Sequence, residues 1–178
     1  MPTKPGERKL QILQTLASML EKPKSEKITT AALAARLDVS EAALYRHFAS
    51  KAQMFEGLIE FIEQTLFGLV NKITAEESSG LKQLEAIMTT LLGFAKKNPG
   101  MTRVLIGDAL VNEDERLQAR INQLHDRLEA TLKQALRFAI SEKQIPENTD
   151  AAAQANLMIA FVVGRWHQFA KSGFRRDP

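Results

Sequence analysis

The stretch Ile28–Phe55, ITTAALAARLDVSEAALYRHFASKAQMF, decides the fold of this chain. Residues of the kind that cap helix N-termini recur along it at Thr29, Ser40 and Ser50. An apolar residue stands just before each of the first two caps, where it packs back onto the helix as a hydrophobic staple, and Gln53 completes a Ser-x-x-Gln capping box at the third. Three caps so close together predict two short helices followed by a longer one.

The turn between the two short helices falls at Leu37-Asp38-Val39. Such a turn needs a residue that tolerates a left-handed backbone, most often glycine, and Asp38 is an acceptable second choice because its short side chain forms local hydrogen bonds. With the apolar positions packed inward, the second short helix keeps five residues outward: Ser40, Glu41, Ala42, Tyr45 and Arg46. A helix about 10 Å wide fits the B-DNA major groove, which is about 12 Å wide, so the sequence predicts a DNA-reading helix-turn-helix.

The pattern TT-x-x-LA-x-x-x-x-VS-x-x-x-LYRHF-x-SK-x-x-MF over Thr29–Phe55 resembles the DNA-binding domain of the TetR-family regulators. One position departs from the family pattern, since Asp38 stands where glycine is common. The resemblance implies an all-α protein, with an N-terminal three-helix helix-turn-helix DNA-binding domain over residues 1–49. A C-terminal helical bundle over residues 50–178 would serve regulation, dimerisation and partner binding. Binding to palindromic double-stranded DNA as a homodimer is also implied, because paired half-sites match a two-fold axis.

The same resemblance implies which residues meet the DNA. The expected DNA-binding residues are Lys9, Thr29, Thr30, Ser40, Glu41, Ala42, Tyr45, Arg46, His47 and Lys51. Phosphate contacts position a protein on the duplex and base contacts specify the sequence. We expect Tyr45, His47, Lys51 and the two threonines at phosphates, and we expect three residues nearest the base edges: Ser40, Ala42 and Arg46.

Charge is distributed unevenly along the chain. Residues 1–51 carry nine Lys/Arg against five Asp/Glu, and residues 52–178 carry fifteen against sixteen. So small a basic excess alone fits an ordinary solvated surface. Here it coincides with the helix-turn-helix segment, as expected of the end that faces a polyanion.

Composition argues against several other classes of protein. The 178 residues include no cysteine, so disulfide and thiol chemistry are excluded. The polar start MPTKPGERK predicts no signal peptide. The longest apolar run, Leu157–Gly164, is far shorter than the ~18 residues that suggest a membrane-spanning helix. We expect a soluble, cytoplasmic protein.

Signals for catalysis are missing as well. The histidines are His47, His125 and His167, and none has a partner at metal-ligand spacing. His125 and His167 are expected to be surface residues or to have satisfied hydrogen bonds. No GxxxxGK[ST] loop occurs, and no GxGxxG follows a predicted strand. We therefore expect no enzyme, no catalytic residue, no cofactor and no metal site.

Apolar periodicity predicts helices through the rest of the chain. We expect helices at residues 10–21, 50–74, 81–97 and 101–110, then a long helix and a last helix. Asn112 is the expected cap of the long helix, with the acidic run 113–115 in its first turn, where negative charge favours the helix dipole. Thr149 or Asp150 opens the last helix. Isolated glycines suggest close helix packing or a kink at four positions: Gly68, Gly93, Gly107 and Gly164.

The last helix is apolar on more than one face. One stripe contains Ala155, Met158, Ile159, Val162, Trp166 and Phe169, and another contains Leu157, Ala160, Phe161 and Gly164. A helix with one solvent-exposed face needs only one apolar stripe. One stripe then belongs to the core and the other to a dimer interface, unless this is the central helix of a monomeric bundle. The expected dimer-interface residues are Ala160, Phe161, Gly164 and Trp166.

TetR-like proteins usually hold a ligand pocket in the helical body. Six apolar residues are candidates to line one, and they serve equally well as plain core: Met88, Leu92, Phe94, Met101, Phe138 and Met158. A ligand-responsive TetR-type repressor is therefore one functional alternative.

A narrower resemblance extends over most of residues 8–137. The segments SEAALYRHF-x-SK-x-x-MF, LIEFIE-x-x-L, LLGF-x-x-x-NPG-x-TR-x-L-x-G-x-AL and RLQ-x-RINQL-x-x-RLE resemble the nucleoid occlusion factors, a branch of the TetR family. This resemblance implies a nucleoid-associated, DNA-activated inhibitor of cell division. Such proteins bind the C-terminal tail of the tubulin-like division protein FtsZ in a groove between their fourth and fifth helices. The expected partner-binding residues are Phe61, Thr65, Leu69, Thr90, Gly93, Lys97 and Asn98.

Three features depart from the pattern of that branch. Leu69 stands where a basic residue is expected, and Thr90 stands where leucine is expected. Members of the branch also use a further helix in dimerisation, after the point that corresponds to Pro178. We expect either a chain that continues past Pro178 or a smaller dimer interface.

Overall fold

The computed structural model describes residues 5–22 and 28–178, and all regular structure within these residues is helical. The helices are α1 Pro5–Leu20, α2 Thr30–Arg36, α3 Glu41–Tyr45, α4 Lys51–Glu76, α5 Gly80–Lys97, α6 Pro99–Leu105, the 3-10 helix η1 Asp108–Leu110, α7 Glu115–Ser141 and α8 Ala151–Lys171. The predicted all-α fold is confirmed. Residues 1–4, at the polar start of the chain, lie outside the described residues.

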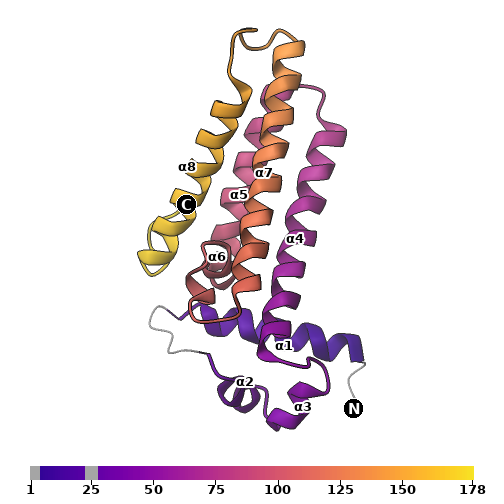
Figure 1. The fold of residues 1–178 in the computed structure, drawn as a ribbon, viewed down its shortest axis with the longest axis vertical. Coiled ribbons are helices and arrows are strands. Elements are labelled where there is room, and N and C mark those ends of the chain that lie inside the picture. Colours follow the sequence, from indigo (N-terminus) through magenta and orange to yellow (C-terminus); the bar gives the residue numbers. More distant parts are fainter. Residues whose placement is uncertain (1–4, 23–27) are drawn as a thin grey trace.

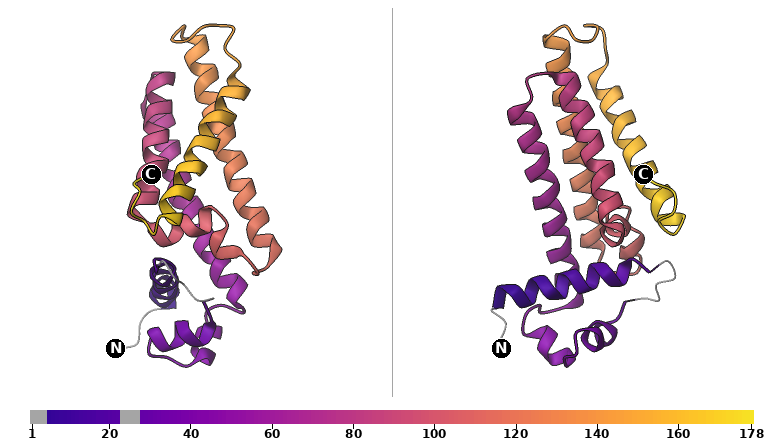
Figure 2. Two further views of the ribbon diagram at one scale, coloured as in Figure 1. Left: turned by 90° about the vertical axis from the view of Figure 1, so that its left-hand side faces the viewer. Right: turned by 180° about the vertical axis from the view of Figure 1, so that it is seen from behind.

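Four long helices stand side by side as an elongated body, and α1 crosses its foot (Figure 1). These four helices are α4, α5, α7 and α8. In both further views, α2 and α3 lie below α1, at the end opposite the loop that joins α7 to α8 (Figure 2). The short helix α6 lies at the foot and contacts α1, α5 and α8. The helix-turn-helix unit therefore projects from one end of the body.

The body packs around α7. This helix contacts α4, α5 and α8. Its apolar residues recur every three or four positions and are buried: Leu117, Ile121, Leu124, Leu128 and Leu132. Full burial of each such side chain contributes about 1.5–3 kcal/mol to folding.

Trp166 joins α8 to the core, and its prediction as a dimer-interface residue is wrong. Its side chain is completely buried. Its indole Nε1–H donates to the carbonyl oxygen of Leu91 on α5 at 3.0 Å. Because the ring is enclosed within one chain, it has no surface to offer to a partner.

The three predicted caps are present. The side-chain oxygens of Thr29, Ser40 and Ser50 accept hydrogen bonds from backbone N–H groups three residues further on, at 3.1, 3.3 and 3.2 Å. Gln53 differs from expectation, because its Oε1 accepts from the Ala49 N–H at 2.9 Å. The capping box predicts a bond from Ser50 N–H instead, so the reciprocal contact closes one residue earlier in the chain.

Two residues with left-handed backbone mark turns that matter for function. Asp38 has φ 53°, as the helix-turn-helix turn predicts. Asn112 has φ 65°, so the chain turns there and the prediction that Asn112 caps the long helix is wrong. Asp114 is the cap, because its carboxylate accepts from the Arg116 N–H at 3.0 Å. The acidic run is therefore divided, and Glu113 is left in the loop before α7.

Three of the four isolated glycines do not mediate close packing within the chain, whereas Gly107 has a close neighbour and a turn. A Cβ added to Gly68, Gly93 or Gly164 would meet nothing within 4 Å. Gly107 has φ 77°, and it separates α6 from η1, so the helix predicted over 101–110 is two short pieces.

Close approaches to backbone atoms of another helix occur at two other glycines. A Cβ on Gly80 would lie 2.4 Å from the backbone nitrogen of Ala139, and a Cβ on Gly100 would lie 2.0 Å from the carbonyl oxygen of Ala17. Both neighbours are backbone atoms that no rotamer change can move. Glycine therefore lets α5 cross α7, and lets α6 cross α1, at backbone contact.

Arg103 strengthens the junction between α6 and α1. Its Nη1 donates to the Leu20 carbonyl oxygen at 3.2 Å, and its Nη2 lies 2.8 Å from Asp108. Lys171 of α8 also pairs with Asp108. Burial raises the pKa of Asp108, but hydrogen bonds and charge from Lys171 and Arg103 outweigh it and hold that pKa below its usual range.

We predict that Gly100→Ala weakens the packing of α1 on the helical body and lowers the stability of the protein. The added methyl group forces α6 away from the Ala17 carbonyl, and overpacking of this kind costs about 1–3 kcal/mol. Thermal unfolding measures the loss. Gly68→Ala is the control, because its methyl group meets nothing and alanine favours a helix, so its melting temperature should stay equal or rise. Equal melting temperatures for Gly100→Ala and the parent would contradict the backbone contact.

Candidate functional site

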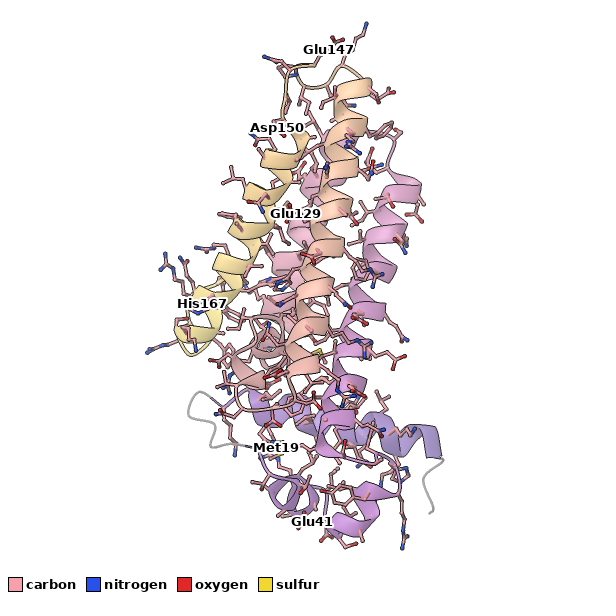
Figure 3. All side chains as sticks on the ribbon, in the orientation of Figure 1. Met19, Glu41, Glu129, Glu147, Asp150 and His167 are labelled. Carbon is pink, nitrogen blue, oxygen red and sulfur yellow. The ribbon has the colours of Figure 1, made fainter. Side chains whose placement is uncertain are left out.

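The residues expected to meet DNA form the lower surface of α2 and α3. Seven of them are exposed: Lys9, Thr29, Ser40, Glu41, Ala42, Tyr45 and Arg46. Thr30, His47 and Lys51 are partly buried. Glu41 projects at the end of the molecule farthest from the loop that carries Glu147 (Figure 3). The geometry thus brings the set to one accessible end, and the role of each residue stays a prediction.

The recognition helix α3 is held from behind by buried apolar side chains. Leu44 on α3 and Leu33 on α2 are almost completely buried and share a cluster with Leu16 of α1. Phe48, just after α3, is buried too, and the Lys9 amine lies 5.6 Å from the centroid of its ring. Contact with α2 and the burial of Leu44 and Phe48 fix the direction in which the short helix presents its outer side chains.

A polar chain ties the outer faces of α2 and α3 together. The Thr30 hydroxyl donates to Glu41 Oε2 at 2.6 Å, and the Tyr45 hydroxyl donates to Thr30 Oγ1 at 3.5 Å. Because the Thr30 hydroxyl hydrogen is used, its oxygen can only accept from a ligand. This arrangement sets Glu41 and Tyr45 at fixed positions on the exposed surface.

Lys51 is the basic residue of the set that does not point freely to solvent. Its Nζ lies 2.5 Å from Glu113 Oε1, and the two side chains retain only 22% and 12% of their exposure. Its amine also lies 5.8 Å from the centroid of the Phe55 ring. The sequence did not signal this pair, because 62 positions separate the two residues and Glu113 was predicted to lie in a helix.

The residues expected to bind a partner also converge. A groove of about 530 Å³ opens between α4 and α5. Its lining contains all seven predicted residues, together with two that sequence reasoning missed: Phe61, Thr65, Leu69, Thr90, Gly93, Lys97 and Asn98, with Thr89 and Phe94. Helical spacing was the available signal for the missed pair, since Thr89 lies four positions before Gly93 and Phe94 lies four positions after Thr90.

The floor of this groove is apolar and is not needed by the core. Phe61 and Leu69 are 38% and 44% exposed, whereas Leu58, Ile62 and Leu66 on the same helix are completely buried. Exposed large apolar side chains in a concave surface favour an apolar ligand. The surface therefore has the composition of a docking groove.

Polar groups stand around the groove. A Cβ on Gly93 would meet nothing, so this position leaves open space in the wall. Asn98 donates its Nδ2 to the Phe94 carbonyl oxygen at 2.8 Å, which fixes its side chain at the end of α5. Lys97 is the charged side chain among the lining residues, and it is exposed. The groove thus has one basic end.

Residues proposed to line a ligand pocket instead pack on the core. Met88, Leu92, Met101 and Met158 are partly buried against it. Phe94 lines the α4–α5 groove, whereas Phe138 lines a separate open hollow of about 570 Å³ between the ends of α4, α5 and α7. This separation favours the interpretation of these six residues as core and surface positions.

His125 differs from expectation. Burial lowers its pKa, and a hydrogen bond with the Leu105 backbone opposes that effect only partly. Its ring lies 6.0 Å from that of Trp166, and within the described residues its buried Nε2 has no hydrogen-bond partner. His125 is thus neither a surface residue nor fully satisfied.

The described residues show neither a membrane-spanning helix nor a metal-binding cluster. No helix in residues 5–22 and 28–178 is both long enough and apolar enough to cross a bilayer. No group of three or more His, Cys, Asp or Glu side chains in that part of the chain is placed to hold a metal ion.

Solved structures define the class of the fold. A TetR-family transcriptional regulator from Agrobacterium tumefaciens superposes with a TM-score of 0.79 over 96% of this chain and 93% of its own, at 18% identity. The TetR-family regulator PfmR from Thermus thermophilus gives 0.74 over 94% and 88%, at 22% identity. The family of bacterial regulatory proteins named after TetR matches residues 25–58. The fold is that of a TetR-type regulator, a class of DNA-binding regulators and not of enzymes.

Sequence relatives define the branch within this class. A domain family described as tetracyclin repressor-like, C-terminal domain, of SlmA-like type, matches residues 78–178. The nucleoid occlusion factor SlmA of Alteromonas mediterranea is 54% identical over 171 residues, which cover 96% of this chain and 88% of the relative. That of a Marinomonas species is 50% identical over 178 residues, covering 100% and 90%. The chain belongs to the SlmA family of nucleoid occlusion factors.

We predict that Phe61 is a surface residue in energetic terms. Phe61→Ala should change the free energy of unfolding by less than about 1 kcal/mol, since the ring is not part of the buried core. Phe55→Ala, which empties a buried site on the same helix, should cost about 3–5 kcal/mol. Denaturant unfolding of both variants measures the difference. Equal losses would show that Phe61 is core.

Proposed function

We propose that this protein acts in the cytoplasm on the nucleoid, where it binds palindromic chromosomal DNA as a homodimer. In that state it inhibits assembly of the division ring by binding the C-terminal tail of FtsZ in the α4–α5 groove. The observation that carries this proposal is the convergence of the seven predicted partner-binding residues on one open groove.

The DNA half of the proposal is supported by the shape and charge of the foot. A short helix with exposed Ser40, Ala42 and Arg46 can enter the major groove, while exposed Tyr45 and Thr29 would meet phosphates beside it. Thr30 would donate to a phosphate only after its hydroxyl leaves Glu41. The basic excess of residues 1–51 favours this end for a polyanion.

The groove suits an extended peptide with aliphatic anchors and acidic residues. Phe61 and Leu69 offer apolar contact along α4, and Lys97 with Asn98 offers hydrogen bonds and positive charge at one end. Leu69 lengthens the apolar floor where the family pattern has a basic residue. In this protein, acidic residues of the tail would therefore be held mainly at the Lys97 end.

The homodimer is supported by the outer face of α8. Leu157 and Phe161 are 64% and 53% exposed, and Ala160 and Gly164 beside them are exposed as well. Small residues four positions apart let a second helix approach closely. Contact between two copies of this face would form a two-fold dimer, which matches the symmetry of a palindromic site.

The experiment that tests the groove is Gly93→Glu. The added side chain fills the open space beside Phe61 and brings a negative charge toward an acidic peptide, so binding of a labelled FtsZ tail peptide should be abolished. DNA binding should be unchanged, because Gly93 lies on α5, outside the helix-turn-helix unit formed by α2 and α3. Fluorescence anisotropy with and without specific DNA measures both.

Gly68→Glu is the matched control, because Gly68 is also an exposed helical glycine with open space and does not line the groove. Phe61→Ala should weaken tail binding by about 2 kcal/mol, roughly 30-fold, if its ring is an anchor. Parent affinity in both Gly93→Glu and Phe61→Ala would reject the groove.

We also predict that Gly164→Leu yields monomers. A leucine at this position prevents close approach of a second helix to α8, whereas within one chain it meets open space. Sedimentation measures the oligomeric state, and binding to a palindrome should weaken with it. Gly68→Leu adds the same side chain to another exposed helix and should leave the dimer intact. An unchanged dimer in Gly164→Leu would reject this face.

A further inference from the structure

One ion pair joins the DNA-binding surface directly to the helical body. Lys51 is the first residue of α4, five positions after Arg46 of the recognition helix, and Glu113 lies in the loop between η1 and α7. Their 2.5 Å contact is largely shielded from solvent. A charge pair with so little exposure is screened by salt less than a surface pair.

Both partners are positioned by well-defined caps. Ser50 caps α4 through the Gln53 N–H, which fixes where Lys51 begins its side chain. On the other side, Asn112 turns the chain in a left-handed conformation and Asp114 caps α7. Glu113 is held between these two residues, so its carboxylate is presented to Lys51 by the shape of the loop.

The ion pair already neutralises the positive charge of Lys51, which a DNA phosphate would need. In the proposed DNA surface, Lys51 stands at the start of a long helix, where the backbone favours an anion such as a phosphate. Its ammonium is already neutralised by Glu113 and covered to about four-fifths. A phosphate that approaches Lys51 therefore meets the Glu113 carboxylate beside the ammonium, and repulsion between the two anions favours exchange over sharing.

We propose that Glu113 is a positioning residue of the DNA surface, which holds Lys51 in the free protein and gives it up to a DNA phosphate on binding. This inference rests on the proposed DNA-binding function. Lysine keeps an anionic partner in both states, while Glu113 loses its partner and is left near a polyanion. The exchange releases the loop 111–114, which leads into α7 and so into contact with α4, α5 and α8.

The test compares Glu113→Gln with Glu115→Gln in DNA binding. Both variants remove one negative charge, but Glu115 is exposed in the first turn of α7 and forms no ion pair within the described residues. The probe is a duplex selected by the parent protein from a random-sequence pool, titrated at several salt concentrations. Glu113→Gln should bind several-fold tighter than Glu115→Gln. Its salt dependence should be steeper by up to about 0.9, because no cation is taken up by a freed carboxylate.

Lys51→Met, which keeps the aliphatic stem, separates this exchange from a general charge effect. Lys51→Met alone should bind several-fold more weakly, with a salt dependence close to that of the parent, because the parent only exchanges one anion at Lys51 for another. When combined with Lys51→Met, Glu113→Gln should raise the affinity for DNA no more than Glu115→Gln does. Two results would overturn the inference while leaving the proposed function intact. One is that Glu113→Gln raises DNA affinity equally with and without Lys51, and the other is that Lys51→Met binds DNA as tightly as the parent.

Hydrogen exchange of the parent protein supplies a measurement that needs no variant. Amides of residues 112–115 should exchange faster in the DNA complex than in the free protein, because the loop has lost its anchor. Unchanged or slower exchange there would overturn the inference. If the parent selects no duplex at all, the proposed function fails first and the inference fails with it.

Discussion

The backbone contact between α6 and α1 fixes how the helix-turn-helix unit stands on the body. Gly100 meets the Ala17 carbonyl without a side chain between them, and Arg103 bonds the carbonyl of Leu20 at the end of the same helix. Because α2 packs on α1 and α3 packs on α2, the orientation of the proposed DNA surface depends on this junction. Asp108, shared by Arg103 and Lys171, extends the junction to α8.

The second connection between foot and body is α4 itself. Its first residue, Lys51, belongs to the proposed DNA surface, and Phe61, ten positions later, lines the groove. At 1.5 Å per residue, the two lie about 15 Å apart along a continuous helix. The opposite wall of the groove is α5, which is locked to α7 at Gly80. A tilt of α4 on DNA binding would therefore change the width of the groove.

Local signals in the sequence were sufficient to predict the helices at the foot of the molecule. Capping residues and apolar spacing predicted α2, α3 and the start of α4, because these features depend on neighbours within one turn. The cap of α7 was missed because Asn112 and Asp114 both suit that role, and only the left-handed turn at Asn112 decides between them. Trp166 was misassigned because α8 is apolar on several faces, and only contact with the distant Leu91 carbonyl shows which face is inside.

The candidate site residues also divide into those that the sequence indicated and those that only the tertiary structure reveals. The groove was predicted by resemblance, whereas its physical basis lies in tertiary structure: apolar residues on α4 that the core leaves exposed, and open space at Gly93 on α5. The pair of Lys51 and Glu113 had no sequence signal, since it depends on where a loop places one carboxylate after 62 residues of chain. Side-chain pairs between distant elements are fixed by packing, and packing is not periodic.

Distance also limits how DNA can influence a peptide in the groove. Lys97 and Asn98 end α5 at the foot, so the basic end of the groove is its end nearest the DNA surface (Figure 1). A bound acidic residue there would lie in the repulsive field of the duplex. That field falls off over about 8 Å at physiological salt, whereas α4 alone separates Lys51 from Phe61 by about 15 Å. Direct electrostatics is therefore weak at the Phe61 wall of the groove, and an effect of DNA on that wall is expected to pass through the α6–α1 junction, the loop at Glu113 or the tilt of α4.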